Sequence, residues 1–438
     1  MRAVKAAAAG VLRPLPNRPD RLSIRPKSPR LQPLAREEKK DTAMADASPP
    51  DFDPAARQAR SRPSGKVADF RYKPPSRPAE IGSAEPRGVA PPAAEPASPD
   101  GPRRRQAFAA LDLGTNNCRL LIARPSGEHF TVIDAFSRVV RLGEGLAATG
   151  RLSDAAMDRA LGALHICADK LKRRNVHLAR SVATEACRRA ENGADFIARV
   201  REETGIALDI ISAQEEARLA VLGCHILLED GEGPAVVFDI GGGSTELVLI
   251  EPGGPVPRIL DWLSVPWGVV SLTDSAPPPD GTEERRVQRY AKMRQLVSAA
   301  FEPFAERVAP VARAAPRVRL LGTSGTVTTL ASVHLELPHY DRQAVDGLIM
   351  PSTAMREVCA RLATMSAQQR SELPCIGDDR ASLVVAGCAI LEAILDIWPA
   401  ETLGVADRGI REGILRSLIA ADARAEESRA EVMRRRGI

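Results

Sequence analysis

Two stretches of this 438-residue chain share one layout: a short apolar run ends in Asp, passes a turn of small residues and resumes as a second apolar run. They cover residues 110–122 and 237–250, and their aspartates are Asp112 and Asp239. Apolar residues resume directly after each turn, so each stretch is predicted as strand, tight turn, strand. A P-loop or dinucleotide-binding turn would instead open a helix. Glycine-rich turns let backbone N–H groups approach a phosphate closely.

A single turn of this kind would be interpreted more simply as a flexible hairpin loop. Two copies with matched Asp and matched apolar flanks favour a functional interpretation instead. The pair predicts a duplicated α/β fold that closes on phosphate from both sides, with an Asp at each strand end placed to hold a neutralising cation.

The first hundred residues differ in composition from the rest of the chain. Residues 1–102 contain 19 of the 35 Pro and no sustained periodicity, which is typical of a disordered segment. Residues 1–105 carry 22 Lys and Arg against 12 Asp and Glu, whereas the remainder carries 39 against 44. The overall net charge of +5 therefore belongs to the tail. This segment is consistent with a transit peptide in the first 19 residues or with a translation start at Met44.

Cysteine and histidine usage argues against a disulfide framework or a Cys/His metal site. The seven Cys include no CxxC pair, and the six His show no ligand spacing. We expect reduced thiols and a cytoplasmic protein. The most apolar stretch, residues 382–397, contains Glu392 and is shorter than the ~20 residues of a membrane span. It predicts a buried helix, and we expect no membrane contact.

The segments after the two hairpins repeat one order of elements. The first hairpin is followed by an expected strand at 130–142, a helix from about Ser153 and a strand at 178–183. The second is followed by a strand at 259–270, a helix at 283–301 and a strand at 318–321, with an insertion placed in the Pro-rich loop 276–281. The repeat divides the chain into a disordered tail (1–105), a first domain (106–213), a second domain (214–404) and a C-terminal helix (405–438) that returns toward the first domain.

A helix is expected to begin between the two halves. Ser212 and Glu215 have the spacing of a capping box, with Ser at the N-cap and Glu at N3. Glu215 then has a structural role, and Glu216 projects from a different face. The sequence alone leaves Glu216 as either an exposed helix residue or a carboxylate that meets a ligand held by both hairpins.

Taken together, these segments resemble the exopolyphosphatase/guanosine pentaphosphate phosphohydrolase family, Ppx/GppA, over about residues 107–420. The resemblance rests on the two hairpins and on Thr-Glu-Ala-Cys-Arg at 184–188, Glu-Glu-Ala-Arg at 215–218, Gly-Thr-Ser-Gly-Thr at 322–326 and Gly-Ile-Arg-Glu-Gly at 409–413. It implies a two-domain fold of the actin, Hsp70 and sugar-kinase type (actin-like, ribonuclease H-like) with the active site in the interdomain cleft. The chain is similar to the short form of the family, which lacks a C-terminal HD-type domain.

The resemblance also implies residue roles. Glu216 matches the catalytic carboxylate that activates water, and Asp112, Asp239 and Glu246 match the carboxylates around Mg²⁺, with Mn²⁺ as an alternative ion. Arg188 matches an arginine that contacts polyphosphate; Arg119 is a further candidate, unless it faces solvent from its strand. The phosphate-binding residues implied by the loops are Gly114, Thr115, Asn116, Asn117, Gly241, Gly242, Gly243, Ser244, Thr245, Gly322, Ser324, Gly325 and Thr326.

The implied function is an exopolyphosphatase that releases terminal orthophosphate by Mg²⁺-assisted attack of water. Hydrolysis of guanosine pentaphosphate (pppGpp) is the alternative, because its terminal phosphoryl chemistry is the same. We also expect a homodimer. Two other functions remain as alternatives. One is a kinase of the same superfold, which would need an acceptor, and the other is a filament-forming nucleotide-binding protein. Nucleic-acid binding through the basic tail is disfavoured, because the whole chain has only three Tyr and three Trp for base stacking.

Overall fold

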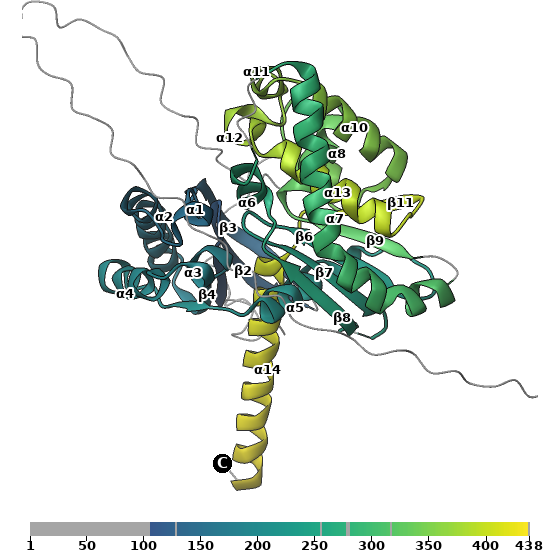
Figure 1. Ribbon diagram of the computed structural model, residues 1–438. Helices are drawn as coiled ribbons and strands as arrows, with labels where there is room; N and C mark the ends of the chain where they lie inside the picture. Colours follow the sequence, from purple (N-terminus) through teal and green to yellow (C-terminus); the bar gives the residue numbers. More distant parts are fainter. Residues whose placement is uncertain (1–105, 128, 255, 277–280, 316–317, 437–438) are drawn as a thin grey trace, which may run out of the picture. The chain divides into compact units, whose positions relative to one another are not determined.

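Each of the two strand–turn–strand motifs lies inside its own mixed β-sheet (Figure 1). The computed structural model describes residues 106–127, 129–254, 256–276, 281–315 and 318–436, all within one compact unit. The prediction of a disordered tail at 1–105 lies outside the described residues, as does most of the Pro-rich loop 276–281.

The first sheet has the strand order β3-β2-β1-β4-β5. The first hairpin supplies β1 and β2, which pair antiparallel with Asp112 opposite Arg119, while β4 and β5 continue the sheet in parallel. The strands are β1 (Ala107–Leu113), β2 (Asn117–Ser126), β3 (His129–Val139), β4 (Val176–Ala183) and β5 (Leu208–Ile210), and the helices are α1 (Leu146–Thr149), α2 (Asp154–Arg173), α3 (Glu185–Arg189) and α4 (Gly193–Thr204).

The second sheet has the order β8-β7-β6-β9-β11-β10, so its first five strands repeat the topology of the first sheet. The predicted duplication and the mixed α/β class are confirmed by this order. Its strands are β6 (Ala235–Ile240), β7 (Thr245–Glu251), β8 (Arg258–Val265), β9 (Arg319–Thr323), β10 (Ile349–Pro351) and β11 (Thr402–Ala406). Its helices are α6 (Val269–Asp274), α7 (Glu283–Ala314), α8 (Gly325–His334), α9 (Arg342–Val345), α10 (Ser352–Thr364), α11 (Ala367–Ser371), α12 (Gly377–Ala381) and α13 (Val384–Ile397).

Two expected elements of the second half have different bounds. The strand predicted at 259–270 ends at Val265, because Pro266 cannot donate to the ladder and Val269 already begins α6. The first two N–H groups of α6, from Val269 and Val270, donate to the carbonyls of Gly241 and Gly242 at 2.9 and 2.8 Å. The helix predicted at 283–301 continues to Ala314 through two internal prolines, and Phe304 and Val308 of this extension are buried in the core of this half.

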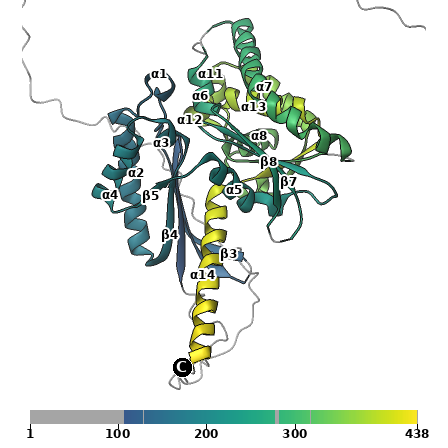
Figure 2. The same ribbon diagram turned by 60° about the horizontal axis from the view of Figure 1, so that its bottom comes forward.

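Two further helices, α5 (Ala213–Cys224) and α14 (Ile410–Arg436), connect the halves, and a short 3-10 helix, η2 (His225–Leu227), follows α5. Ile414 and Leu415 of α14 pack on the first sheet, against a cluster that includes Phe108 and Leu121. Leu219 of α5 joins this cluster, whereas Ala217, Val221 and Cys224 of α5 pack on the second sheet. The two helices contact each other directly, at the point where Gly413 of α14 meets the backbone of α5 (Figure 2).

The buried helix expected at 382–397 is confirmed as α13, which begins at Val384 and is almost wholly buried. All seven Cys are free thiols, and six of them are buried. Within the described part of the chain, no helix is both long and apolar enough to cross a membrane.

Candidate functional site

Residues from both sheets line one cleft with a volume of about 150 Å³. Both glycine-rich turns contribute to it, together with the turn after β9 and the loop before α14. The predicted site residues that line it are Asp112, Gly114, Thr115, Asn116, Asn117, Glu216, Asp239, Gly241, Gly242, Gly243, Ser244, Glu246, Ser324, Gly325 and Thr326.

The two turns have the same internal hydrogen bond and lie against each other. Gly114 N donates to Asn117 O at 2.9 Å, and Gly241 N donates to Ser244 O at 3.0 Å. A Cβ atom added to Gly242 would lie 3.1 Å from Asn116 N, closer than most real Cβ contacts. Glycine at this position therefore lets the second turn approach the first, and both turns line the cleft.

Four of the predicted site carboxyl groups line the cleft and have raised pKa values. Burial raises the pKa of Asp239 to about 6. Burial, followed by repulsion from Asp239, raises that of Glu246 to about 8. Burial and then Glu246 raise the pKa of Glu216 well above its usual range, and burial also raises that of Asp112. Each group loses water and faces another carboxylate, so the site as a whole favours an added positive charge.

A hard cation fits this arrangement. Oδ1 of Asp112 is buried and has no hydrogen-bond partner in the structure, so a coordination position is open there. Across the described ranges, no three His, Cys, Asp or Glu side chains are grouped as a metal cage. Mg²⁺ does not need one, because it usually keeps several waters and takes one or two carboxylates plus phosphate oxygens. Asp112 and Asp239 suit that role better than Glu246, whose Oε1 already accepts hydrogen bonds from Ser244 and Ser264 at 2.7 and 2.8 Å.

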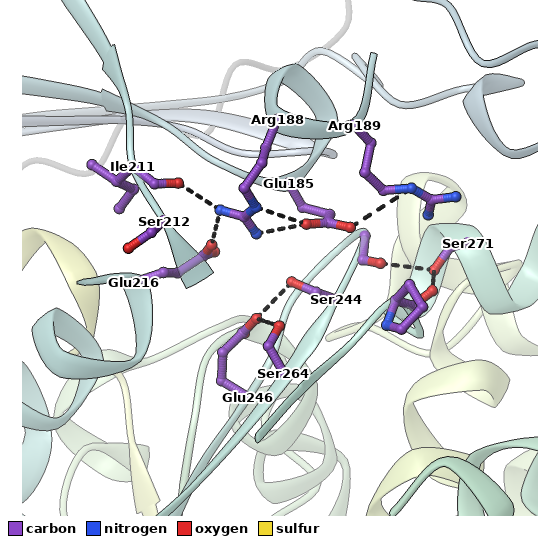
Figure 3. A network of polar contacts seen from close by, with 12 residues as sticks. Glu185, Arg188, Arg189, Ile211, Ser212, Glu216, Ser244, Glu246, Ser264 and Ser271 are labelled. Carbon is purple, nitrogen blue, oxygen red and sulfur yellow. Dashed lines mark hydrogen bonds and ion pairs between the residues drawn. The ribbon is translucent and has the colours of Figure 1, made fainter. Parts of the chain in front are cut away.

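Glu216 lies near the start of α5, where its carboxylate is buried beside an arginine. Ser212 caps this helix by accepting a hydrogen bond from Glu215 N at 3.2 Å, as predicted. The reciprocal half of the capping box was wrong, since the Glu215 carboxylate accepts from Arg180 and Arg218 instead. Glu216 Oε2 accepts a hydrogen bond from Arg188 Nη1 at 3.0 Å (Figure 3).

Three of the predicted phosphate-binding residues do not line the cleft. The Arg188 guanidinium contacts Glu185, Glu216 and the carbonyl of Ile211, and it is not among the cleft-lining residues. Thr245 is buried and donates to Trp267 O at 2.6 Å. Gly322 pairs with Phe238 within the second sheet.

Four arginines also line the cleft, and most of this arginine wall was not predicted; its members are Arg119, Arg380, Arg408 and Arg411. Arg119, considered either a phosphate ligand or a solvent-facing residue, lines the cleft. Burial and then Arg411 lower the pKa of Arg119, so positive charges are crowded on this side. The signal for Arg411 was its place in the Gly-Ile-Arg-Glu-Gly motif, whereas Arg380 and Arg408 had no such signal. Arg408 is held by Asp346 at 2.8 Å.

Known proteins are similar to this chain over most of its described length. The Ppx/GppA phosphatase family matches residues 121–421. Exopolyphosphatase 2 of Mycobacterium tuberculosis is 34% identical over 328 residues, covering 71% of this chain and 98% of that protein. Exopolyphosphatase 1 of Mycobacterium bovis is 29% identical and covers 70% of this chain and 87% of that one.

Solved structures share the fold. The Ppx/GppA family member of Aquifex aeolicus is 28% identical with a TM-score of 0.58, covering 72% of this chain and 98% of that chain. An exopolyphosphatase from Cytophaga hutchinsonii, 23% identical with a TM-score of 0.62 over 72% and 98% of the two chains, has the same fold. The family match spans most of the described residues, and the first mycobacterial relative matches over nearly its whole length. This chain therefore belongs to the Ppx/GppA phosphatase family.

Proposed function

We propose that this protein is an exopolyphosphatase, which hydrolyses the terminal phosphoanhydride of inorganic polyphosphate and releases orthophosphate. The observation that carries the proposal is the cleft itself: two glycine-rich turns, one from each half, and a buried carboxylate, Glu216, line the same space of about 150 Å³. Relatives named exopolyphosphatase are similar over most of this chain, which supports the same substrate class.

The terminal phosphoryl group would bind between the two turns. Both turns line the cleft, so their backbone N–H groups could face the equatorial oxygens of the transferred group without reorganisation. The arginine wall, with Arg119 and Arg411, suits the following phosphates, because guanidinium groups bind phosphate through paired N–H donors. A Mg²⁺ held by Asp112 and Asp239 would supply charge neutralisation for the reacting phosphate.

Glu216 is the proposed general base. Its carboxylate accepts the proton of a water molecule, the water oxygen forms a bond to the terminal phosphorus, and the bridging P–O bond breaks. The products are orthophosphate and a chain shorter by one phosphate. Burial raises the pKa of Glu216, whereas Arg188 acts to lower it and so favours the ionised carboxylate that a base requires. General-base catalysis of this kind contributes about 10²–10⁴ in rate.

Hydrolysis of pppGpp is the alternative within the same site, since the family name covers both activities. We further propose Mg²⁺ as the metal, a cytoplasmic location and a homodimeric state, each of which is open to direct measurement.

Phosphate release from purified protein tests the proposal, with polyphosphate and pppGpp compared side by side and no acceptor present. Orthophosphate is expected from polyphosphate, and Glu216→Gln is expected to lower kcat about 10²–10⁴-fold. Transfer only in the presence of an acceptor would identify a kinase instead. Full activity of Glu216→Gln would remove the general-base assignment.

A further inference from the structure

Glu185 is a buried carboxylate that lines the cleft outside the set of predicted site residues. It is the first residue of α3, lines the cleft and is 9% exposed. Its side chain lies against the second glycine-rich turn, since a Cβ atom added to Gly243 would be 2.9 Å from Glu185 Cγ. Glu185 thus stands where the turn of one half meets a helix of the other.

The Glu185 carboxylate holds Arg188 in a forked contact. Oε2 of Glu185 accepts hydrogen bonds from Arg188 Nε at 3.1 Å and from Nη2 at 2.6 Å (Figure 3). The two residues are three apart on one helical turn, so their side chains share a face of α3. With Nε and Nη2 engaged, the planar guanidinium is fixed in orientation.

The remaining nitrogen of that guanidinium is directed at the proposed base. Arg188 Nη1 donates to Glu216 Oε2 at 3.0 Å and to Ile211 O at 2.8 Å, at the residue before the helix cap. The chain of contacts therefore runs from Glu185 through Arg188 to Glu216. Arg188 without Glu185 would keep only the two Nη1 contacts, and its guanidinium would be free to rotate about them.

We propose that Glu185 is a positioning residue for hydrolysis, which holds the Arg188 guanidinium against Glu216 and so fixes the carboxylate of the base. This inference rests on the proposed function, because it concerns the orientation of the same base. Glu185 itself contacts neither water nor substrate in this role.

A matched pair of substitutions tests this role. Glu185→Gln and Glu185→Met both remove the negative charge and keep an unbranched side chain of similar length, but only Gln retains an oxygen that accepts from Arg188. Glu185→Met is expected to lower kcat by about 10–100-fold, since a misplacement near 1 Å can cost about 10²-fold. Glu185→Gln is expected to keep kcat within a few-fold of wild type, and both variants are expected to leave KM for polyphosphate nearly unchanged.

A double-mutant cycle separates positioning from packing. In the Arg188→Met background, Glu185→Met is expected to cause no further loss of kcat, because the contact it breaks is already gone. Arg189, which lies 3.8 Å from the other Glu185 oxygen, provides the control, and Arg189→Met is expected to retain wild-type kcat. Equal kcat for the Gln and Met variants, or additive losses in the cycle, would overturn the proposal.

Crystal structures of the two variants give a measurement that does not depend on activity. The Arg188–Glu216 contact is expected to persist in Glu185→Gln and to be lost in Glu185→Met. Its persistence in Glu185→Met would overturn the positioning role even if polyphosphate hydrolysis is established. Failure of the wild-type protein to hydrolyse polyphosphate, in contrast, would count against the proposed function and leave this structural comparison to decide the role of Glu185.

Discussion

The contact between α5 and α14 predicts an unusually large effect for a one-carbon substitution. A Cβ atom added to Gly413 would lie 2.0 Å from Leu219 O and 2.8 Å from Leu219 C, both backbone atoms of α5. Real Cβ atoms essentially never come within 3.0 Å of another heavy atom, so Gly413→Ala must move the helices apart by about 1 Å. Overpacking of this kind costs about 1–3 kcal/mol.

The displaced helix also carries the proposed base, because Glu216 is three residues before Leu219 on α5. We therefore expect Gly413→Ala to lower the thermal midpoint by several degrees and also to lower kcat by up to about 100-fold. Thermal unfolding by circular dichroism and initial rates of phosphate release measure the two effects on the same preparation.

Gly162→Ala is the control for this substitution. Gly162 lies on an exposed face of α2, and an added Cβ would meet nothing within 4 Å. Alanine there is expected to stabilise the protein by roughly 0.5–1 kcal/mol and to leave kcat unchanged. A Gly413→Ala protein with wild-type midpoint and kcat would refute the argument that α5 and α14 are in backbone contact.

Three further predictions concern the charged residues Asp239 and Asp134 and the charged segment 1–105. Asp239→Asn is expected to raise the Mg²⁺ concentration for half-maximal activity. It is not expected to lower the metal-free thermal midpoint, because it removes a carboxylate that repels Glu246. An unchanged metal requirement would contradict the metal role. Asp134 has a lowered pKa, since hydrogen bonds from Lys170 and Arg174, at 2.8 Å each, outweigh the opposing effect of burial. Its folded pKa lies below the unfolded one, so its contribution is present above the usual Asp range and lost as the pH falls through the folded value. Asp134→Asn should therefore lower the free energy of unfolding by about 1–2 kcal/mol at pH 7, and this deficit should shrink in urea titrations at acid pH; a constant deficit would refute the assignment. Residues 1–105 carry 22 Lys and Arg against 12 Asp and Glu, so their deletion should raise the KM for long polyphosphate at low salt only. A loss of kcat at every salt concentration would contradict a purely electrostatic role.

The features predicted well from sequence are those that depend on neighbouring residues. Asp112 and Asp239 end strands and precede turns of small residues, and this local pattern was enough to predict both hairpins and the duplication. Ser212 was predicted as a helix cap for the same reason. The bounds of β8 were wrong because apolar residues continue past Pro266 into α6, and a buried strand and a buried helix start look alike in such a run.

The partners of charged side chains could not be predicted in the same way. Glu215 and Glu216 are adjacent, yet one is paired with Arg180 and Arg218 and the other is buried beside Arg188. The difference depends on what each face of α5 packs against. Arg380 likewise reaches the cleft from α12, more than 250 residues after the first turn, and nothing in its own sequence neighbourhood indicates this position.

The charge distribution of the cleft explains how a site rich in carboxylates can take a polyanion. Asp112, Asp239 and Glu246 would repel phosphate if they were fully ionised, and burial is the main cause of their raised pKa values. A divalent cation relieves that repulsion and presents positive charge to the reacting phosphate. Arg119 of the arginine wall is repelled by Arg411, and a bound phosphate chain would relieve this repulsion. The cation relieves repulsion among the carboxylates, and the substrate relieves repulsion among the arginines. Their binding should therefore be mutually favourable, with each raising the affinity of the site for the other by the same factor.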